Sequence, residues 1–141
     1  GYQKVPFWDK LDSIGIDAYF PLTQKFDATP AELIASWQQI AANLDAFSLS
    51  NNKKITITEV GYQSLDGTNV YPWWVDTWPD PQEQADCYQA MFEALFNRET
   101  IDGIYPWMCY HDPSQDVNRY DFIGKPAEAV VNDFCHREDK P

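Results

Sequence analysis

The chain has 141 residues, of which 44% are hydrophobic and 16% aromatic, so its length suits one ordinary domain with a buried core. Ten Lys and Arg against 22 Asp and Glu give a net charge of −12, which argues against nucleic acid or an anionic membrane as partner, because both would repel it. No apolar run approaches the roughly 20 residues that a bilayer crossing needs.

A strand followed by a helix is predicted near the start of the chain. Ser13–Phe20 favours a strand that ends before a proline. Thr29 suits the N-cap of a helix, Pro30 suits its first position, and Glu32 completes a capping box. Apolar residues then recur at helical spacing as far as Leu44, so this helix has one apolar face.

The middle of the chain predicts a second strand, an aromatic loop and a second helix. Ser48–Lys54 is polar and turn-like, and the alternating Ile and Thr of Lys54–Thr58 favour a strand. After a loop rich in Trp, the segment Asp80-Pro81-Gln82-Glu83 repeats the pattern of cap, proline and acid. The helix that follows has an apolar stripe between Ala85 and Phe96.

The last third of the chain predicts one more strand and one more helix. Ile101–Met108 favours a strand, and a polar loop then leads to Gly124-Lys125-Pro126 and a final helix. The tail His136–Pro141 is charged and is expected to fray. The complete order of strand and helix, repeated three times, predicts βα units around a parallel sheet.

Three βα units leave the fold class open between two alternatives. A barrel of this kind needs eight strands and roughly 250 residues, so three units cannot close one. A parallel sheet also needs both faces covered and its edges protected. The residue pattern alone therefore indicates either a small open α/β domain or a piece of a larger α/β barrel.

The cysteines predict neither disulfides nor a metal site. Cys87, Cys109 and Cys135 are odd in number, widely spaced and without a CxxC pair, so they are interpreted as buried or partly buried free thiols. Cys109 forms a local trio with His111 and Asp112, but no second cluster of ligand-type residues accompanies the trio. We therefore predict no metal and no cofactor.

Aromatic residues in loops are the unusual feature of the composition. The chain has six Trp, eight Tyr and eight Phe, and several lie in Phe7-Trp8 and in the run Tyr71–Trp78. Loop aromatics that cannot all reach one core indicate a binding face. Sugar rings have apolar faces that stack on indoles, so an oligosaccharide or polysaccharide is the predicted ligand. The alternative is that some of these Trp only cover one end of the fold.

Polar residues gather where the three predicted strands end. The first strand ends in Asp17–Pro21, the second in Thr58–Tyr62 and the third in Trp107–Asp112. Active sites of βα barrels lie at this edge. Glu59, which has Gly61 two residues after it, can therefore point at a substrate. The alternative for Glu59 is a carboxylate that caps a turn or pairs with a surface Lys.

The residues themselves resemble a known family. Phe7–Leu22 resembles the sixth-strand region of glycoside hydrolase family 113, the β-mannanases, and Ile57–Ser64 is similar to its seventh-strand motif. Trp107 resembles the eighth-strand tryptophan of the wider clan, and Gly124–Glu128 is similar to the start of the last helix. The resemblance implies that residues 1–141 are the C-terminal segment of a (β/α)₈ TIM-barrel catalytic domain, with strands six to eight.

The resemblance also implies roles for individual residues. Glu59 matches the nucleophile of a retaining mechanism, Tyr19 is expected to position it, and Trp107 is expected to stack under the sugar at the cleaved bond. Further candidates for the walls of sugar subsites are Trp74, Trp73, Tyr62, Trp78 and Trp8.

One catalytic group of the family is missing from the sequence. Retaining hydrolysis needs a second carboxyl about 5–5.5 Å from the nucleophile, and in this clan it comes from strand four, commonly in an Asn-Glu pair. The sequence contains no Asn-Glu dipeptide. Asp17 and Asp112 are poor substitutes, because Asp17 belongs to a strand motif and Asp112 to an Asp-Pro turn. The acid/base is therefore expected on an N-terminal portion.

Three hypotheses remain open from the sequence. The chain is part of a retaining, endo-β-mannanase-like glycoside hydrolase that needs an N-terminal portion, or a non-catalytic carbohydrate-binding relic, or a structural fragment that self-assembles. In each case an open barrel edge predicts a complementary chain or self-association. A polysaccharide substrate would favour an extracellular location.

Overall fold

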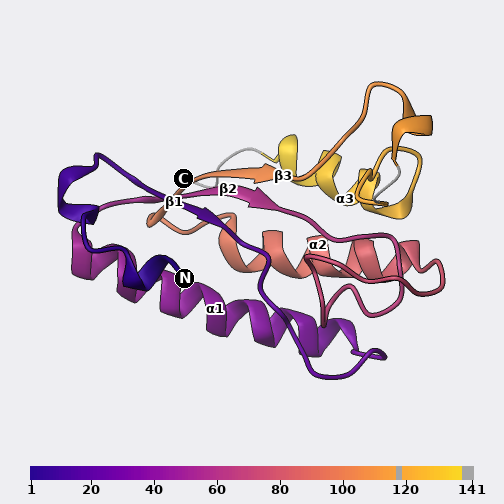
Figure 1. The fold of residues 1–141 in the computed structure, drawn as a ribbon, viewed down its shortest axis with the longest axis horizontal. Coiled ribbons are helices and arrows are strands. Elements are labelled where there is room, and N and C mark those ends of the chain that lie inside the picture. The colour runs from indigo at the N-terminus through magenta and orange to yellow at the C-terminus, as the bar shows by residue number, and fades with distance from the viewer. Residues whose placement is uncertain (117–118, 138–141) are drawn as a thin grey trace.

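Three parallel strands alternate with three helices in the computed structural model, which describes residues 1–116 and 119–137 (Figure 1). The sheet has the order β1-β2-β3, so each strand pairs with its neighbour in the sequence. The strands are β1 (Ile14–Asp17), β2 (Ile55–Val60) and β3 (Ile101–Pro106). The predicted α/β class and the order of the elements are confirmed.

Each strand is followed by a longer helix. These helices are α1 (Pro30–Asn51), α2 (Pro81–Leu95) and α3 (Pro126–Cys135). Three short 3₁₀ helices, η1 (Tyr2–Lys4), η2 (Trp8–Lys10) and η3 (Pro113–Gln115), lie before β1 and after β3. Within the described ranges, no helix is both long and apolar enough to cross a membrane.

The predicted caps explain where the two long helices begin. The Thr29 hydroxyl accepts from the Glu32 amide, and the Glu32 carboxylate accepts from the Thr29 amide at 2.8 Å, which is the reciprocal capping box. The Asp80 carboxylate likewise accepts from the amides of Gln82 and Glu83. Each cap satisfies amides that have no partner within the first turn of their helix.

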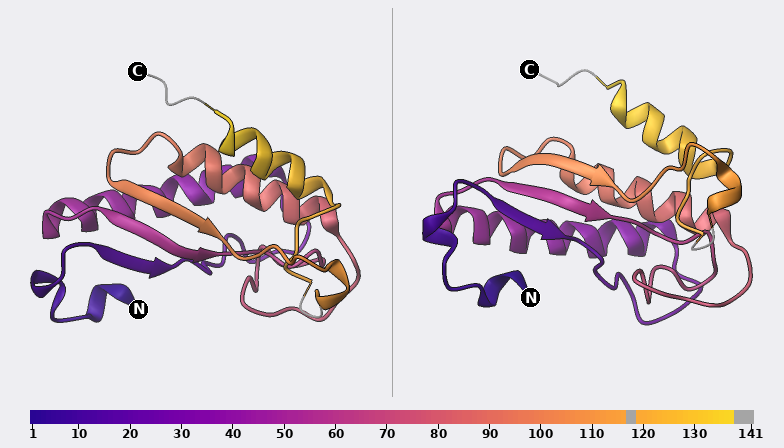
Figure 2. Two further views of the ribbon diagram at one scale, coloured as in Figure 1. Left: turned by 90° about the horizontal axis from the view of Figure 1, so that it is seen from above. Right: turned by 45° about the horizontal axis from the view of Figure 1, so that its top comes forward.

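The core lies between one face of the sheet and the helices. Ile14 and Ile16 of β1, and Ile55 and Ile57 of β2, are buried against this layer. Figure 2 shows α1 and α2 side by side on that face, with α3 next to α2. Burial of each of these side chains contributes roughly 1.5–3 kcal/mol, so the helix-covered face stabilises the unit. The α1 residues in the core are Leu33, Trp37, Ala41 and Leu44.

The other face of the sheet is open in the part of the chain that the structure describes. Asp17, Thr58 and Tyr105 are exposed there. Gly15 faces the Thr58 methyl group on the same side. Strands β1 and β3 are both edge strands of this sheet, since β2 lies between them. One bare face and two free edges are what three units of a closed barrel would present.

Several predicted boundaries are wrong by a few residues. Helix α1 continues through Ser48 and ends at Asn51, because Ser48 is buried and Asn52 then takes a left-handed C-cap with φ 50°. The first and third strands are shorter than predicted, and the second extends to Val60. Cys87 is buried as expected, but the exposed thiols of Cys109 and Cys135 contradict the prediction of burial. Of the tail expected to fray, residues 138–141 lie outside the described ranges.

Candidate active site

A β-bulge places Glu59 at the carboxyl end of β2. Along β1, Ile16 and Asp17 pair with Ile57 and Glu59, so β2 has one extra residue. The register with β3 also shifts between Ile57 and Val60. An extra residue in one strand breaks the alternation of its side chains and re-aims one of them. Thr58 and Glu59 therefore both avoid the core, and Val60 returns to it with full burial.

Tyr19 contacts the Glu59 carboxylate directly. The Tyr19 hydroxyl donates to Glu59 Oε2 at 3.0 Å, and the Ala18 amide donates to the Glu59 carbonyl at 2.6 Å. Burial, followed by the hydrogen bond to Glu59 and its negative charge, raises the pKa of Tyr19 well above its usual range. The phenol therefore stays protonated at neutral pH and can only donate to the carboxylate.

Trp107 follows β3 beside the same strand end. Its amide donates to the Val60 carbonyl at 2.7 Å, and its own carbonyl accepts from the Tyr88 hydroxyl at 3.0 Å. This carbonyl lies so close to Gly61 that a Cβ there would come within 2.2 Å of it. The backbone of Trp107 is thus fixed next to Val60 and Gly61, the two residues after Glu59, while Trp107 remains 39% exposed.

A second carboxylate lies one strand away, on the bare face. Asp17 accepts from the Thr58 hydroxyl at 2.7 Å, across the β1–β2 pair. Asp112 is elsewhere, in an exposed turn, where hydrogen bonds from Ser114 lower the pKa of its carboxyl. Among the described residues, no group of three or more His, Cys, Asp and Glu side chains is placed to hold a metal ion.

The β2–α2 loop presents three tryptophans to solvent. Trp73, Trp74 and Trp78 are 53%, 59% and 81% exposed. Trp74 lines a hollow of about 270 Å³, and Trp78 lines another of about 500 Å³ that also contains Asp66. Exposed indoles beside carboxylates can contact both the apolar face and the hydroxyl groups of a sugar.

Three loops interlock at this edge of the sheet. The Tyr120 hydroxyl of the β3–α3 loop donates to the Pro72 carbonyl of the β2–α2 loop at 2.6 Å, and burial raises the pKa of Tyr120 to about 12. The ring of Tyr120 also meets that of Tyr19 edge to face, with centroids 6.3 Å apart. On the other side, the Leu22 amide of the β1–α1 loop donates to the Asn69 carbonyl at 2.7 Å.

Two predicted subsite residues lie elsewhere. Tyr62 is fully buried, and its hydroxyl accepts from the Trp37 indole at 2.8 Å, so it belongs to the core rather than to a binding surface. Trp8 lies in η2, before β1 and hence at the amino end of the strands, and its indole donates to the Tyr2 carbonyl. The structure therefore removes Tyr62 and Trp8 from the candidate site.

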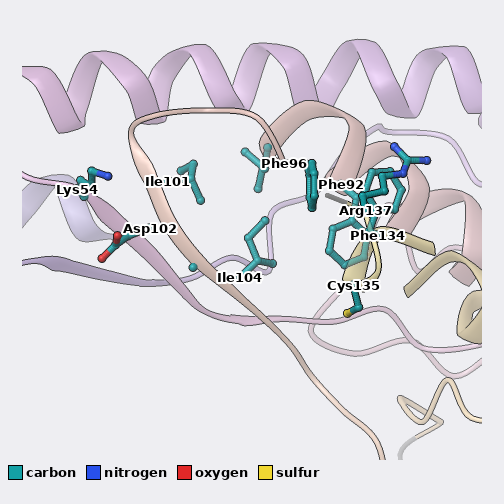
Figure 3. A pocket seen from close by; sticks show the side chains of 11 residues that line it. Lys54, Phe92, Phe96, Ile101, Asp102, Ile104, Phe134, Cys135 and Arg137 are labelled. Carbon is teal, nitrogen blue, oxygen red and sulfur yellow. The ribbon is translucent and has the colours of Figure 1, made fainter. Parts of the chain in front are cut away.

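A hollow of about 480 Å³ lies away from these residues, between β3, α2 and α3. Figure 3 shows Ile101 and Ile104 of β3 on one side of it and Phe92, Phe96 and Phe134 on the other. The charged residues that line the hollow are Lys54, Asp102 and Arg137. Since Lys54 and Ile101 lie where β2 and β3 begin, this hollow reaches the amino end of the sheet, opposite Glu59.

Parallel βα units with a carboxylate at the carboxyl end of one strand are the arrangement expected of part of a (β/α)₈ barrel, whose active sites lie at that end of the strands. The chain belongs to glycoside hydrolase family 113, whose family model matches residues 2–123. No curated protein matches it in a sequence comparison.

Solved structures agree with the family. A GH113 β-1,4-mannanase in a complex is 28% identical, with a TM-score of 0.75 over 96% of this chain and 43% of that chain. A GH113 β-mannanase from Alicyclobacillus acidocaldarius in complex with ManMIm is 27% identical, with a TM-score of 0.74 over 95% and 42%. The chain thus spans less than half the length of these mannanases.

A more distant likeness concerns the fold alone. A β-D-glucuronidase from Dictyoglomus thermophilum is 14% identical, with a TM-score of 0.59 over 93% of this chain and 24% of that chain. The three structures together identify the fold as a partial barrel of the TIM type, as predicted.

Proposed function

We propose that this chain is the C-terminal segment of a β-mannanase catalytic barrel, in which Glu59 is the nucleophile for retaining hydrolysis of β-1,4-linked mannan. The observation that carries the proposal is the bulge that lifts Glu59 out of the strand alternation and into contact with the Tyr19 hydroxyl. The family match and the mannanase structures supply the substrate class.

The chemistry follows from two carboxyl groups. A Glu59 oxygen attacks the anomeric carbon while an acid protonates the leaving glycosidic oxygen, so the glycosidic bond breaks and a glycosyl ester forms. Water, deprotonated by the same second group, then attacks the anomeric carbon and releases Glu59. The second carboxyl is assigned to the part of the barrel that the mannanases have beyond the region matched here.

Tyr19 and Trp107 support this step in different ways. A protonated Tyr19 hydroxyl orients Glu59 and stabilises its negative charge through a charge-assisted hydrogen bond. Trp107 offers an indole beside the cleaved bond. Trp73, Trp74 and Trp78 form further subsite walls along the β2–α2 loop.

The bare sheet face and the hollow beside β3 are covered by the remaining βα units, on the same or a complementary polypeptide. The phenylalanines and isoleucines of that hollow suit the apolar side chains of an added parallel strand (Figure 3). Light scattering of the 141-residue chain alone should therefore show self-association or aggregation, and a stable monomer would contradict this part of the proposal.

The decisive experiment is Glu59→Gln in the chain combined with the remaining βα units. Turnover of manno-oligosaccharides should fall by at least about 10³-fold, since the amide is a poor nucleophile, whereas binding should stay within a few-fold. Initial rates and isothermal titration measure the two effects. Unchanged turnover would refute the assignment of the nucleophile.

A non-catalytic carbohydrate-binding role is the second candidate, and the exposed tryptophans favour it because they do not depend on Glu59. Mannan oligosaccharides should then change the tryptophan fluorescence of a wild-type protein that shows no turnover. A flat titration, together with no turnover, would leave only a structural role.

A further inference from the structure

A buried carboxylate at the start of α2 holds the aromatic loop from inside. Glu83 is only 8% exposed, and its Oε2 accepts from the Gly67 amide at 2.8 Å. Its Oε1 accepts from the backbone amide of Asn69 at 2.9 Å and from the Asn69 side chain at 2.7 Å. Three donors from the β2–α2 loop therefore converge on one side chain of the helix that follows the loop.

Asn69 extends this network to the β1–α1 loop. Its side-chain amide also donates to the Phe26 carbonyl at 3.1 Å, and its side-chain oxygen accepts from the Thr23 hydroxyl at 2.5 Å. Its backbone carbonyl accepts from Leu22. One asparagine thus joins two loops that leave neighbouring strands, and Glu83 fixes that asparagine.

The network reaches the exposed indoles through packed rings. Gly67 has φ +84°, and a Cβ at Gly67 would lie 2.4 Å from the Phe26 ring, so the loop passes tightly over that ring. Phe26 contacts Tyr71 with centroids 6.4 Å apart, and Tyr71 contacts Trp73 at 6.1 Å. The Gly67 carbonyl also accepts from the Tyr71 amide at 3.1 Å.

The tryptophans contribute little to their own placement. Trp73 and Trp74 are more than half exposed, so burial of their rings does not hold the loop in place. Burial also raises the pKa of the Glu83 carboxyl, which shows that this charge is held in an unfavourable environment. A buried carboxylate that fixes the loop while the indole rings stay in solvent is suited to preorganise those rings for a ligand.

We propose that Glu83 and Asn69 are positioning residues that set the aromatic β2–α2 loop for binding an extended mannan chain, while the cleavage step depends on Glu59. This inference rests on the proposed function for its ligand. The loop geometry that it requires is independent of that function, so the two can fail separately.

The first test is Glu83→Gln in the chain combined with the remaining βα units. The amide nitrogen cannot accept a hydrogen bond, so at least one of the three donors loses its partner. KM for a manno-oligosaccharide should rise at least about fivefold, and kcat should stay within about twofold, because the change weakens binding away from the cleaved bond. A fall in kcat with an unchanged KM would overturn the proposal.

Asp45→Asn is the matched control. Asp45 of α1 joins Arg98 and Thr100 in the α2–β3 connection, so the same carboxylate-to-amide change breaks a comparable anchor at the other end of the sheet. This variant should lower stability without changing KM or kcat. An equal rise of KM in both variants would reduce Glu83 to a general stabilising residue and would refute a positioning role.

The second test needs no substrate. Hydrogen exchange of residues 64–80 should become at least tenfold faster in Glu83→Gln than in Asp45→Asn, and Asn69→Ala should give a smaller increase, because Glu83 keeps its two backbone donors. Asn69→Ala also serves if Glu83→Gln does not fold. Unchanged exchange would overturn the inference even if mannan is cleaved, whereas faster exchange without any mannan turnover would refute only the proposed function.

Discussion

Asp45, at the amino end of the sheet, and Glu59, at its carboxyl end, are held by different kinds of partner. At the amino end, Asp45 is paired with Arg98 and Thr100, and only Asn52–Lys54 connects α1 to β2. At the carboxyl end, Glu59 is held by a neutral phenol, and a long loop from Gly61 to Asp80 separates β2 from α2. A carboxylate neutralised by arginine stabilises a connection, whereas one held by a neutral donor keeps its charge for a ligand.

Of the substitutions at the carboxyl end of the sheet, Gly61→Ala should lower the stability most. The new Cβ would lie 2.2 Å from the Trp107 carbonyl, which is itself fixed by Tyr88, so the end of β3 must move. We expect a loss of about 3 kcal/mol in the free energy of unfolding, as for other overpacked sites. Urea denaturation measures it.

Gly103→Ala is the control for this substitution. Its Cβ would meet the Tyr105 ring at 3.3 Å, and this exposed ring can move, so the loss should be below about 1 kcal/mol. Equal stability of the two variants would show that the Trp107 carbonyl does not constrain the strand end.

Tyr19→Phe should weaken catalysis while leaving the amino end unaffected. Hydrogen bonds to charged groups contribute about 1.5–3 kcal/mol, so losing the Tyr19 donor should reduce kcat roughly 10- to 100-fold. Tyr2→Phe, in the η1 segment before β1, should have no effect on the rate. Steady-state kinetics compares the two, and equal rates in both variants would remove Tyr19 from the mechanism.

Local signals predicted most of the fold. The capping patterns at Thr29 and Asp80 gave correct helix starts, because a cap depends only on residues within one turn. The parallel sheet followed from the alternating elements, and the position of Glu59 near the end of the second strand followed with it, whereas its catalytic role stays a prediction. The end of α1 was wrong because Ser48 packs in the core, a tertiary contact that its polarity conceals.

The differences between prediction and structure at single residues have separate causes. The bulge at Thr58–Glu59 adds one residue to β2, and a period-two pattern cannot show which residue is extra. Tyr62 was expected to line a subsite because it follows the strand end, and its burial against Trp37 is a tertiary contact that the sequence does not show. Glu83 was interpreted only as part of a capping pattern, because its partners Gly67 and Asn69 are reached through the folded loop. Trp8 could have been excluded, since it precedes β1 and must lie at its amino end.

Tyr62→Phe tests whether Tyr62 belongs to the core or to the sugar-binding site. Removing the Tyr62 hydroxyl leaves the buried Trp37 indole without its acceptor, which should cost about 1–2 kcal/mol of unfolding free energy. Binding of manno-oligosaccharide should not change. Thermal denaturation and titration calorimetry separate the two effects, and weaker binding without a loss of stability would return Tyr62 to the subsite walls.

The smallest effect concerns the pH dependence of the Glu83 anchor. Burial raises the pKa of its carboxyl and Asp80 adds to the shift, while hydrogen bonds from Asn69 and Gly67 oppose it. A raised pKa means that the folded chain binds this proton more tightly than the unfolded chain, for which the value is 4.5. The part of the stability that depends on protonation of Glu83 is therefore fully present below the unfolded value and is lost as pH rises through the folded value.

The Glu83→Gln variant has no titratable group at this position, so comparing it with the wild-type chain isolates the effect of Glu83 protonation on stability. As pH rises above the unfolded value of 4.5, the Tm of the wild-type chain relative to Glu83→Gln should fall. Asp45→Asn, measured in the same way, controls for titration of the other carboxylates. A wild-type advantage that grows with pH would mean that the hydrogen bonds from Asn69 and Gly67 outweigh the effect of burial on the pKa of Glu83, and would contradict this prediction.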